Sequence, residues 1–301
     1  MQNRAATALM DLCGRVGRAL PDVRGRGRIA ISLSSLLIRA GADPIIEGRM
    51  ASGHRMRLDC RVPSHCWAFF SGRYDDGKIA VLLSLLRPGG IALDVGANIG
   101  FYTVPLAIHA QAIGSKVVAF EPLQSNAALL YHNLGLNNCL DVVQVIESGL
   151  GNESALAKIV LSDDFLTGGT VGNATIMSDA LYQERYAQFA RTEVKIDTLD
   201  RSWHDGGRID VVKIDVEGNE TQVLEGGRNT IAAHRPVILI EVNRVHQAVR
   251  GINFDEAVPP LLPERYFFAE LRASGIVQIT NLAECTDADV MAIPEERRQE
   301  I

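Results

Sequence analysis

The stretch LDVGANIG, residues 93–100, places an aspartate and a glycine-rich turn directly after a short apolar run. The apolar residues around Asp94 are typical of a buried strand, and Gly96 and Gly100 allow the chain to turn tightly where the strand ends. Ligands of open parallel sheets bind beyond the carboxyl ends of the strands. The spacing here is GxxxG, whereas dinucleotide-binding proteins carry GxGxxG. An acid in this position disfavours an anionic pyrophosphate and favours a cationic group.

From residue 90 onwards the sequence alternates between predicted strands and helices. The strands are rich in Val, Ile and Leu and span 91–95, 115–122, 141–148, 209–216 and 235–242. Apolar strands separated by helices indicate a parallel sheet that is buried on both faces. Two further runs, 266–270 and 275–280, predict an antiparallel hairpin at the sheet edge. We therefore expect an α/β fold with a mostly parallel sheet, helices on both faces and a C-terminal antiparallel hairpin.

Residues 1–73 differ in charge from the rest of the chain. They hold 12 basic and five acidic residues, a net charge of +7, whereas the whole chain of 301 residues carries −6. Helical spacing of apolar residues predicts helices over 6–20 and 29–40, and short strands are expected over 54–71. The sequence predicts a basic, largely helical N-terminal extension over 1–73 and a second domain over 74–301, with an insertion at about 151–193.

The charge distribution also limits the partners. The acidic main body is a poor nucleic-acid binder, so we expect no nucleic-acid partner. The basic N-terminal part allows a weak contact with an anionic membrane surface, although a solvated helical surface is the simpler and preferred explanation. The five cysteines form no CxxC pair, and their odd number argues against a full disulfide framework. With no signal peptide and no transmembrane run in view, we expect a cytoplasmic protein. The sequence leaves the oligomeric state open.

A second acid follows the next predicted strand. Glu121 lies 27 residues after Asp94 and could accept hydrogen bonds from both hydroxyls of an adenosine ribose. A structural explanation is available for each residue alone, because Asp94 could cap a helix and Glu121 could be a first-turn acid. Together, at the ends of neighbouring strands, they favour a pocket for S-adenosylmethionine over one for NAD. Ser148, at the end of the third strand, is a candidate adenine contact.

The fourth predicted strand ends in VVKIDVEGNE, residues 211–220, and supplies a second group of acids. Asp215 and Glu217 could act as a general base, as metal ligands or as substrate contacts. The alternative is that Glu217 and Glu220 are cap and first-turn acids of the next helix. Glu241 and Asn243 could complete a carboxylate cluster. These oxygen side chains also suit a divalent cation such as Mg²⁺, but no spacing requires a metal.

Five motifs in fixed order resemble one known family. LDVGANIGFYT, VVAFEP, HNLGLNN, VKIDTLD and DVVKIDVEGNETQVLEGG closely resemble the FkbM family of S-adenosylmethionine-dependent methyltransferases, over about residues 85–243. The resemblance implies a Rossmann-like class I methyltransferase fold, usually with seven strands of which the last is antiparallel. It also implies O-methylation, commonly of sugar or polyketide hydroxyls.

The resemblance also assigns roles by position. It implies that the methionine and ribose are lined by Asp94, Gly96, Asn98 and Gly100, that Glu121 holds the ribose hydroxyls, and that Asp215 and Glu217 face the transferred methyl group. This chain departs from the family pattern at Ser148, in ESGLGN, and at Tyr74-Asp75, where the family often has Tyr-Glu. We expect residues 163–190 and the N-terminal part to form a substrate lid.

Two functions from different classes remain. The first is an O-methyltransferase that acts on a hydroxyl of a sugar, a glycan or a polyketide-like natural product. The second is a catalytically silent subunit that binds the cofactor within a polysaccharide or natural-product pathway. A nicotinamide-dependent oxidoreductase is disfavoured, since GxGxxG and a Tyr-Lys or His dyad are lacking.

Overall fold

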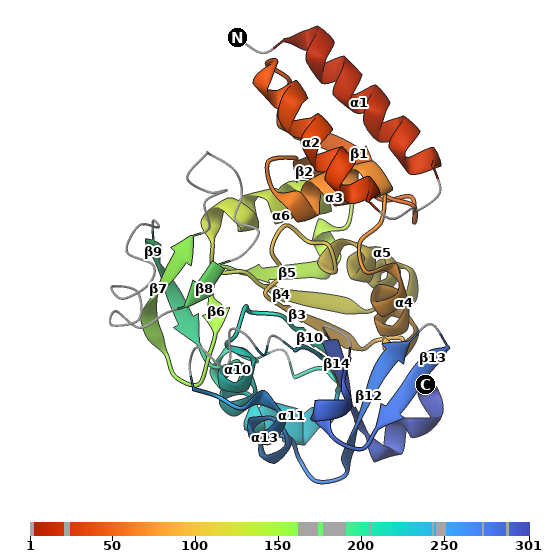
Figure 1. Cartoon of the computed structure of the whole chain (residues 1–301). Coiled ribbons are helices and arrows are strands. Elements are labelled where there is room, and N and C mark those ends of the chain that lie inside the picture. The colour runs from red at the N-terminus through yellow and green to blue at the C-terminus, as the bar shows by residue number, and fades with distance from the viewer. Residues whose placement is uncertain are drawn as a thin grey trace.

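The computed structural model describes residues 3–20, 25–161, 174–176, 191–204, 206–242, 244, 251–272, 274–286 and 289–301. An eight-stranded sheet lies at the centre of this part of the chain, with the strand order β13-β12-β14-β11-β10-β3-β4-β5 (Figure 1). Its five parallel strands are β3 (Ile91–Val95), β4 (Lys116–Phe120), β5 (Val143–Ile146), β10 (Ile209–Ile214) and β11 (Val237–Glu241). All five had been predicted from the sequence.

The other three strands of this sheet are antiparallel. β12 (Tyr266–Arg272) and β13 (Gly275–Ile279) form the expected C-terminal hairpin at the sheet edge. β14 (Asp289–Pro294) lies between β11 and this hairpin and pairs with β11 and β12. The sequence analysis missed β14, so the described sheet has eight strands where seven were expected.

Helices cover both faces of the sheet, as predicted. One face packs against α4 (Asp76–Leu85), α5 (Thr103–Ile113) and α6 (Gln124–Leu136). The other packs against α9 (Leu199–Ser202), α10 (Glu220–Gly226), α11 (Arg228–His234) and α13 (Phe254–Ala257). Successive side chains of each strand enter alternate cores, because a strand points them to opposite faces. The described chain also contains short 3₁₀ helices: η1 (Leu140–Val142), η2 (Pro259–Leu261), η3 (Leu282–Glu284) and η4 (Glu295–Glu300).

A second, four-stranded sheet follows β5 in the chain. It consists of β6 (Gly149–Leu150), β7 (Ala155–Leu161), β8 (Ala174–Ile176) and β9 (Arg191–Asp197), in the order β6-β9-β7-β8. β7 and β9 pair in antiparallel register, so the insertion has paired strands of its own. Apart from β8, the segment 163–190 that we expect to form a lid lies outside the described residues.

The described residues of the N-terminal part form three helices and a β-hairpin. The predicted helices are present as α1 (Arg4–Ala19) and α2 (Arg26–Arg39), followed by β1 (Ile45–Arg49) and β2 (Arg55–Asp59). The expectation of strands over 54–71 is wrong beyond Asp59, because α3 (Pro63–Ser71) is a helix. Pro63 stands in its first turn, where the missing N–H is not needed by the helix.

Phe69 of α3 joins the N-terminal helices to the hairpin. Its ring is fully buried and lies against two glycines. A Cβ added to Gly14 of α1 would lie 2.3 Å from the Phe69 ring, and a Cβ added to Gly48 of β1 would lie 3.1 Å from it. The same apolar core continues through Phe101 to the strands of the large sheet. The N-terminal elements therefore share a core with the sheet, and a domain division at residue 73 stays a prediction. None of the described helices is long and apolar enough to cross a membrane.

We expect Phe69→Ala to lower the free energy of unfolding by about 3–5 kcal/mol, because it leaves a cavity between α1, α3 and β1. Leu12→Ala is the control, since Leu12 lies on the exposed side of α1 and should change stability by less than about 0.5 kcal/mol. Urea unfolding followed by circular dichroism measures both. Equal losses in the two variants would contradict this description of the core.

Candidate active site

Four neighbouring parallel strands bring acidic residues to one edge of the sheet. In the register of the sheet, Ile214 pairs with Val95 on one side and with Ile240 on the other, and Val95 pairs with Phe120. The residues that follow these pairs therefore meet beyond the carboxyl ends of β3, β4, β10 and β11. Among the predicted site residues, this edge gathers Asp94, Gly96, Glu121 and Asp215, as the sequence had suggested.

The turn after β3 contains three residues with positive φ: Gly96 at 79°, Asn98 at 50° and Gly100 at 98°. At Gly96 a Cβ would lie 1.9 Å from the carbonyl oxygen of Asp215, so the turns after β3 and β10 touch through their backbones. At Gly100 a Cβ would lie 2.7 Å from Leu130 of α6. Both glycines are thus required by close packing as well as by the direction of the turn.

Asp94 is fully buried and is held from two sides. Its Oδ2 accepts a hydrogen bond of 2.5 Å from the hydroxyl of Thr103, and its Oδ1 lies 3.3 Å from the Nζ of Lys213. The structure therefore shows Asp94 as a residue that positions the turn. The expected contact between Asp94 and the cofactor stays a prediction.

Lys213 is the residue of this edge that the sequence analysis left out of the site. Its Nζ lies 3.4 Å from Oδ2 of Asp215 and donates a hydrogen bond of 2.8 Å to the carbonyl of Gly96. Burial alone would lower the pKa of Lys213, but the carboxylates of Asp215 and Asp94 outweigh it and raise the pKa. The available signal was the alternation of Lys213 and Asp215, which puts both on one side of β10.

Glu121 ties the turn after β3 to the start of α6. Its Oε2 accepts a hydrogen bond of 2.8 Å from the backbone N–H of Asn98, and its Oε1 accepts one of 2.9 Å from Leu123. Burial raises the pKa of Glu121 to about 7, even though these backbone hydrogen bonds oppose the shift. Each carboxylate oxygen can accept a further hydrogen bond. A role for Glu121 in holding ribose hydroxyls therefore remains compatible with its contacts.

The turn after β10 presents Asp215 and Glu217. The side chain of Asp215 is 32% exposed, so it can be reached from the solvent. Glu217 has a φ of 53°, so the strand has ended before it. Burial, together with the carboxylates of Asp215 and Glu220, raises the pKa of Glu217 to about 8. Glu220 is fully buried and accepts hydrogen bonds from the backbone N–H groups of Val216 and Gly218, so it fixes this turn as the structural interpretation suggested.

Glu241 extends the acidic group onto β11. Burial is the largest cause that raises its pKa to about 10, and the carboxylates of Asp215, Glu217 and Glu220 raise it further. Its Oε2 is buried without a hydrogen-bond partner in the described part of the chain. Asn243, the other predicted residue of this cluster, lies outside the described residues. No group of three or more His, Cys, Asp or Glu side chains that could hold a metal ion is found among the described residues.

Two predicted positions at the border of the site have clear contacts. The hydroxyl of Ser148 donates to the carbonyl of Lys195 on β9, at 3.1 Å, so the structure shows it joining β5 to the second sheet. Its contact with adenine stays a prediction. The ring of Tyr74 stacks on Phe101, with centroids 3.9 Å apart. Asp75 accepts a hydrogen bond of 2.9 Å from the hydroxyl of Tyr102.

The acidic edge and the glycine turn lie in a stretch of the chain that matches a known family of proteins. The family described as "Methyltransferase FkbM domain" matches residues 94–273, more than half of the chain. The chain belongs to the FkbM methyltransferase family. The matched region contains every predicted site residue, from Asp94 to Glu217.

The individual proteins that the chain resembles have low sequence identity to it. Methyltransferase sdnD of Sordaria araneosa is 28% identical over 159 residues, which are 44% of this chain and 59% of that protein. AMB antimetabolite synthetase AmbE of Pseudomonas aeruginosa is 28% identical over 229 residues, 67% of this chain but 10% of that protein. A crystal structure of methyltransferase FkbM from Methylobacillus flagellatus aligns with a TM-score of 0.42 at 14% identity, over 89% of this chain and 59% of that one. The chain thus spans less than two thirds of each of these relatives.

Gly96→Ala and Gly89→Ala form a matched pair for testing the turn after β3. Both glycines have positive φ, 79° and 71°, but a Cβ meets the Asp215 carbonyl at Gly96 and nothing within 4 Å at Gly89. Each variant should lose about 1–2 kcal/mol of stability from backbone strain, and Gly96→Ala should lose more. Only Gly96→Ala should also weaken binding of S-adenosylhomocysteine, measured by calorimetry. Equal affinity in both variants would contradict the proposed place of the pocket.

Proposed function

We propose that this FkbM-family protein is an S-adenosylmethionine-dependent O-methyltransferase that acts on a hydroxyl group of a sugar, a glycan or a polyketide-like natural product. The observation that carries the proposal is the convergence of Glu121, Asp215, Glu217 and Glu241 at one sheet edge, beside the turn from Gly96 to Gly100. Family membership supports the reaction class.

The charge of this edge fits a sulfonium cofactor. Burial, and then neighbouring carboxylates, raises the pKa of Glu217 to about 8 and that of Glu241 to about 10, so both acids hold their protons at neutral pH. A cation beside Glu241 would favour its ionised form, and Oε2 of Glu241 lacks a hydrogen-bond partner among the described residues. When bound, S-adenosylmethionine supplies an electrophilic methyl group. The residues proposed to hold it are Asp94, Gly96, Asn98, Gly100, Glu121 and Ser148.

The acceptor side of the reaction requires a base, because an alkyl hydroxyl is a weak nucleophile. Asp215 suits this role: its carboxylate is partly exposed, and Lys213 holds it at 3.4 Å. Glu217 is protonated below about pH 8 and can then donate a hydrogen bond to the acceptor oxygen. Fixing the acceptor in line with the methyl group supplies much of the rate, since it removes the entropy cost of alignment.

Calorimetric titration with S-adenosylhomocysteine tests the pocket. Glu121→Ala should weaken binding by about 1–3 kcal/mol, because it removes a buried acceptor and releases the Asn98 turn. Glu153→Ala, an exposed acid outside the site, is the control and should bind normally. If Glu121→Ala bound with wild-type affinity, the pocket assignment would be wrong.

Release of S-adenosylhomocysteine with a panel of sugar and polyketide acceptors then tests catalysis. Binding of the cofactor without turnover of any acceptor would favour the silent partner subunit over the enzyme.

The pH dependence of kcat separates the two acids. In the wild type, kcat should fall as the pH rises through about 8, because Glu217 loses the proton that it donates to the acceptor. Glu217→Gln keeps a donor that does not titrate, so its profile should be flat in this range. Asp215→Asn should bind S-adenosylhomocysteine nearly normally and transfer methyl groups at least ~100-fold more slowly, as for a lost general base. Full activity of Asp215→Asn would remove it as the base.

A further inference from the structure

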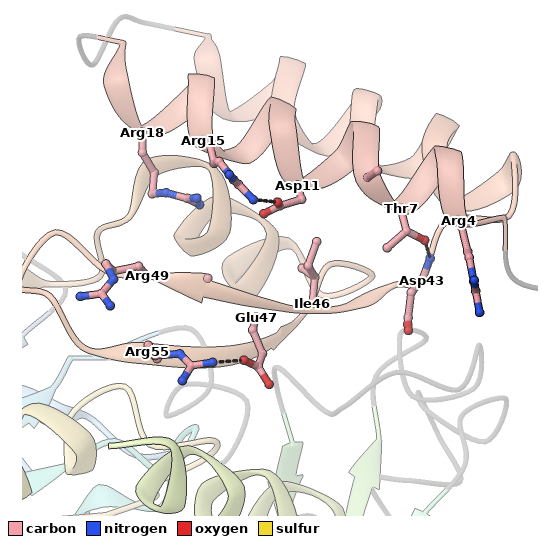
Figure 2. A pocket seen from close by; sticks show the side chains of 12 residues that line it. Arg4, Thr7, Asp11, Arg15, Arg18, Asp43, Ile46, Glu47, Arg49 and Arg55 are labelled. Atoms are coloured by element: carbon pink, nitrogen blue, oxygen red, sulfur yellow. Dashed lines mark hydrogen bonds and ion pairs between the residues drawn. The ribbon is translucent and has the colours of Figure 1, made fainter. Parts of the chain in front are cut away.

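A polar groove in the N-terminal part has no role in the proposed reaction. It has a volume of about 690 Å³ and lies between one face of α1 and the strand β1 (Figure 2). The residues that line it on α1 run from Arg4 to Arg18 at helical spacing, so the groove follows about 20 Å of the helix. None of the predicted active-site residues lines it.

The groove runs along the free edge of β1. Ile46, Glu47, Gly48 and Arg49 are consecutive, and all of them line it. Since successive side chains of a strand point to opposite faces, a cavity that touches four in a row must follow the edge of the strand. β1 belongs to a two-stranded sheet in the described part of the chain, and β2 is its one neighbour there.

The pairing register shows which backbone groups point into the groove. Cys60 donates to Pro44, and Met50 donates to His54, so the even-numbered residues of β1 bond to β2. The N–H groups of Glu47 and Arg49 therefore point away from β2. Neither has a hydrogen-bond partner among the residues that the structure describes.

The opposite edge of the same hairpin is closed. The outward N–H groups of Arg55 and Arg57 on β2 donate to the side chains of Asn137 and Asn133 of α6, at 2.9 Å and 2.7 Å. The amide of Asn137 returns a bond of 2.7 Å to the carbonyl of Arg55. α6 thus satisfies β2 with side chains that imitate a neighbouring strand. On β1 the Asp43 side chain accepts a hydrogen bond of 2.9 Å from the outward N–H of Ile45, but among the described residues no side chain does so for Glu47 or Arg49.

The charges of the groove determine what would bind there. Five arginines and three acids line it. Two pairs neutralise each other near its middle, Arg15 with Asp11 and Arg55 with Glu47 (Figure 2).

Three arginines of the groove have no acidic partner in the described chain. Arg18 donates to the carbonyl of Phe69, and Arg49 donates to that of Gly53, but neither pairs with a carboxylate. Arg4 has neither kind of partner among the described residues. Burial and nearby Arg15 lower the pKa of Arg18, and Asp11 offsets this in part, so an anion beside Arg18 would be favourable.

We propose that this groove binds an extended acidic peptide segment of another protein, which adds as a third strand to the free edge of β1. The backbone of the segment would bond to Glu47 and Arg49, as in other cases of strand addition. Its carboxylates would pair with Arg4, Arg18 and Arg49. About six extended residues would span the groove, at about 3.3 Å per residue. The inference does not rest on the proposed transferase activity.

Fluorescence anisotropy with labelled peptides of about ten residues tests this inference. The probe alternates Glu and Val, and one control replaces each Glu by Lys. A second control keeps the Glu-Val sequence but carries N-methyl groups on its central backbone amides. The wild-type protein should bind the acidic probe, with an affinity that falls as salt is added, and should bind neither control. No binding of the acidic probe, or equal binding of its N-methylated form, would overturn the proposal.

Variants separate strand addition from charge attraction alone. Glu47→Ala and Glu47→Pro both lose the ion pair with Arg55, but only the proline also removes the outward N–H. Glu47→Pro should bind the probe at least ~10-fold more weakly than Glu47→Ala. Arg49→Glu should weaken binding by a similar factor, whereas Arg28→Glu, on an exposed part of α2 outside the groove, should not. Equal affinities of the two Glu47 variants would contradict strand addition.

An anionic lipid surface is the alternative occupant. The flank of α1 away from the groove exposes Leu9, Leu12 and Val16, and lipid would contact this flank. Vesicles of phosphatidylserine and phosphatidylcholine should therefore fail to displace the acidic probe from the wild-type protein. Displacement of the probe by these vesicles would assign the groove to the membrane and overturn the proposal.

Discussion

The ion pairs of Lys213 hold the carboxyl edge of the sheet together. Its buried ammonium group lies between Asp94 at the end of β3 and Asp215 after β10, and it also binds the carbonyl of Gly96. A buried cation is stable only when its charge is compensated, and here two carboxylates compensate it. Because these partners belong to different strands, one side chain fixes the relative position of both turns that form the candidate pocket.

Lys213 is surrounded by more acidic side chains than its single charge can neutralise. Glu217 and Glu241 have raised pKa values, first because they are buried and then because other carboxylates lie near them. Buried acids with raised pKa values are common at functional sites. A sulfonium group beside Glu241 would favour the ionised form of this buried acid.

The N-terminal hairpin shows how one small sheet can have two different edges. Asn133 and Asn137 of α6 close the edge of β2, and Asn133 also binds the carbonyl of Ile99 in the turn after β3. The buried side chain of Asn133 thereby bonds both to the N-terminal hairpin and to the turn after β3. The edge of β1 faces the groove under α1 and is open to a further strand among the described residues. Free strand edges favour association, so an edge beside unpaired arginines favours an acidic partner.

The sequence by itself determined the parallel core, because apolar strands with intervening helices can be buried only in a sheet covered on both faces. It also located the acids at the strand ends, since the strand boundaries fix which residues follow them. Only the tertiary structure decided that Lys213 joins Asp94 to Asp215, that Gly96 touches the backbone of Asp215, and that residues 63–71 form a helix. It also placed β14 between β11 and the hairpin. These features depend on contacts between segments far apart in the chain, and the local periodicity of the sequence does not predict such contacts.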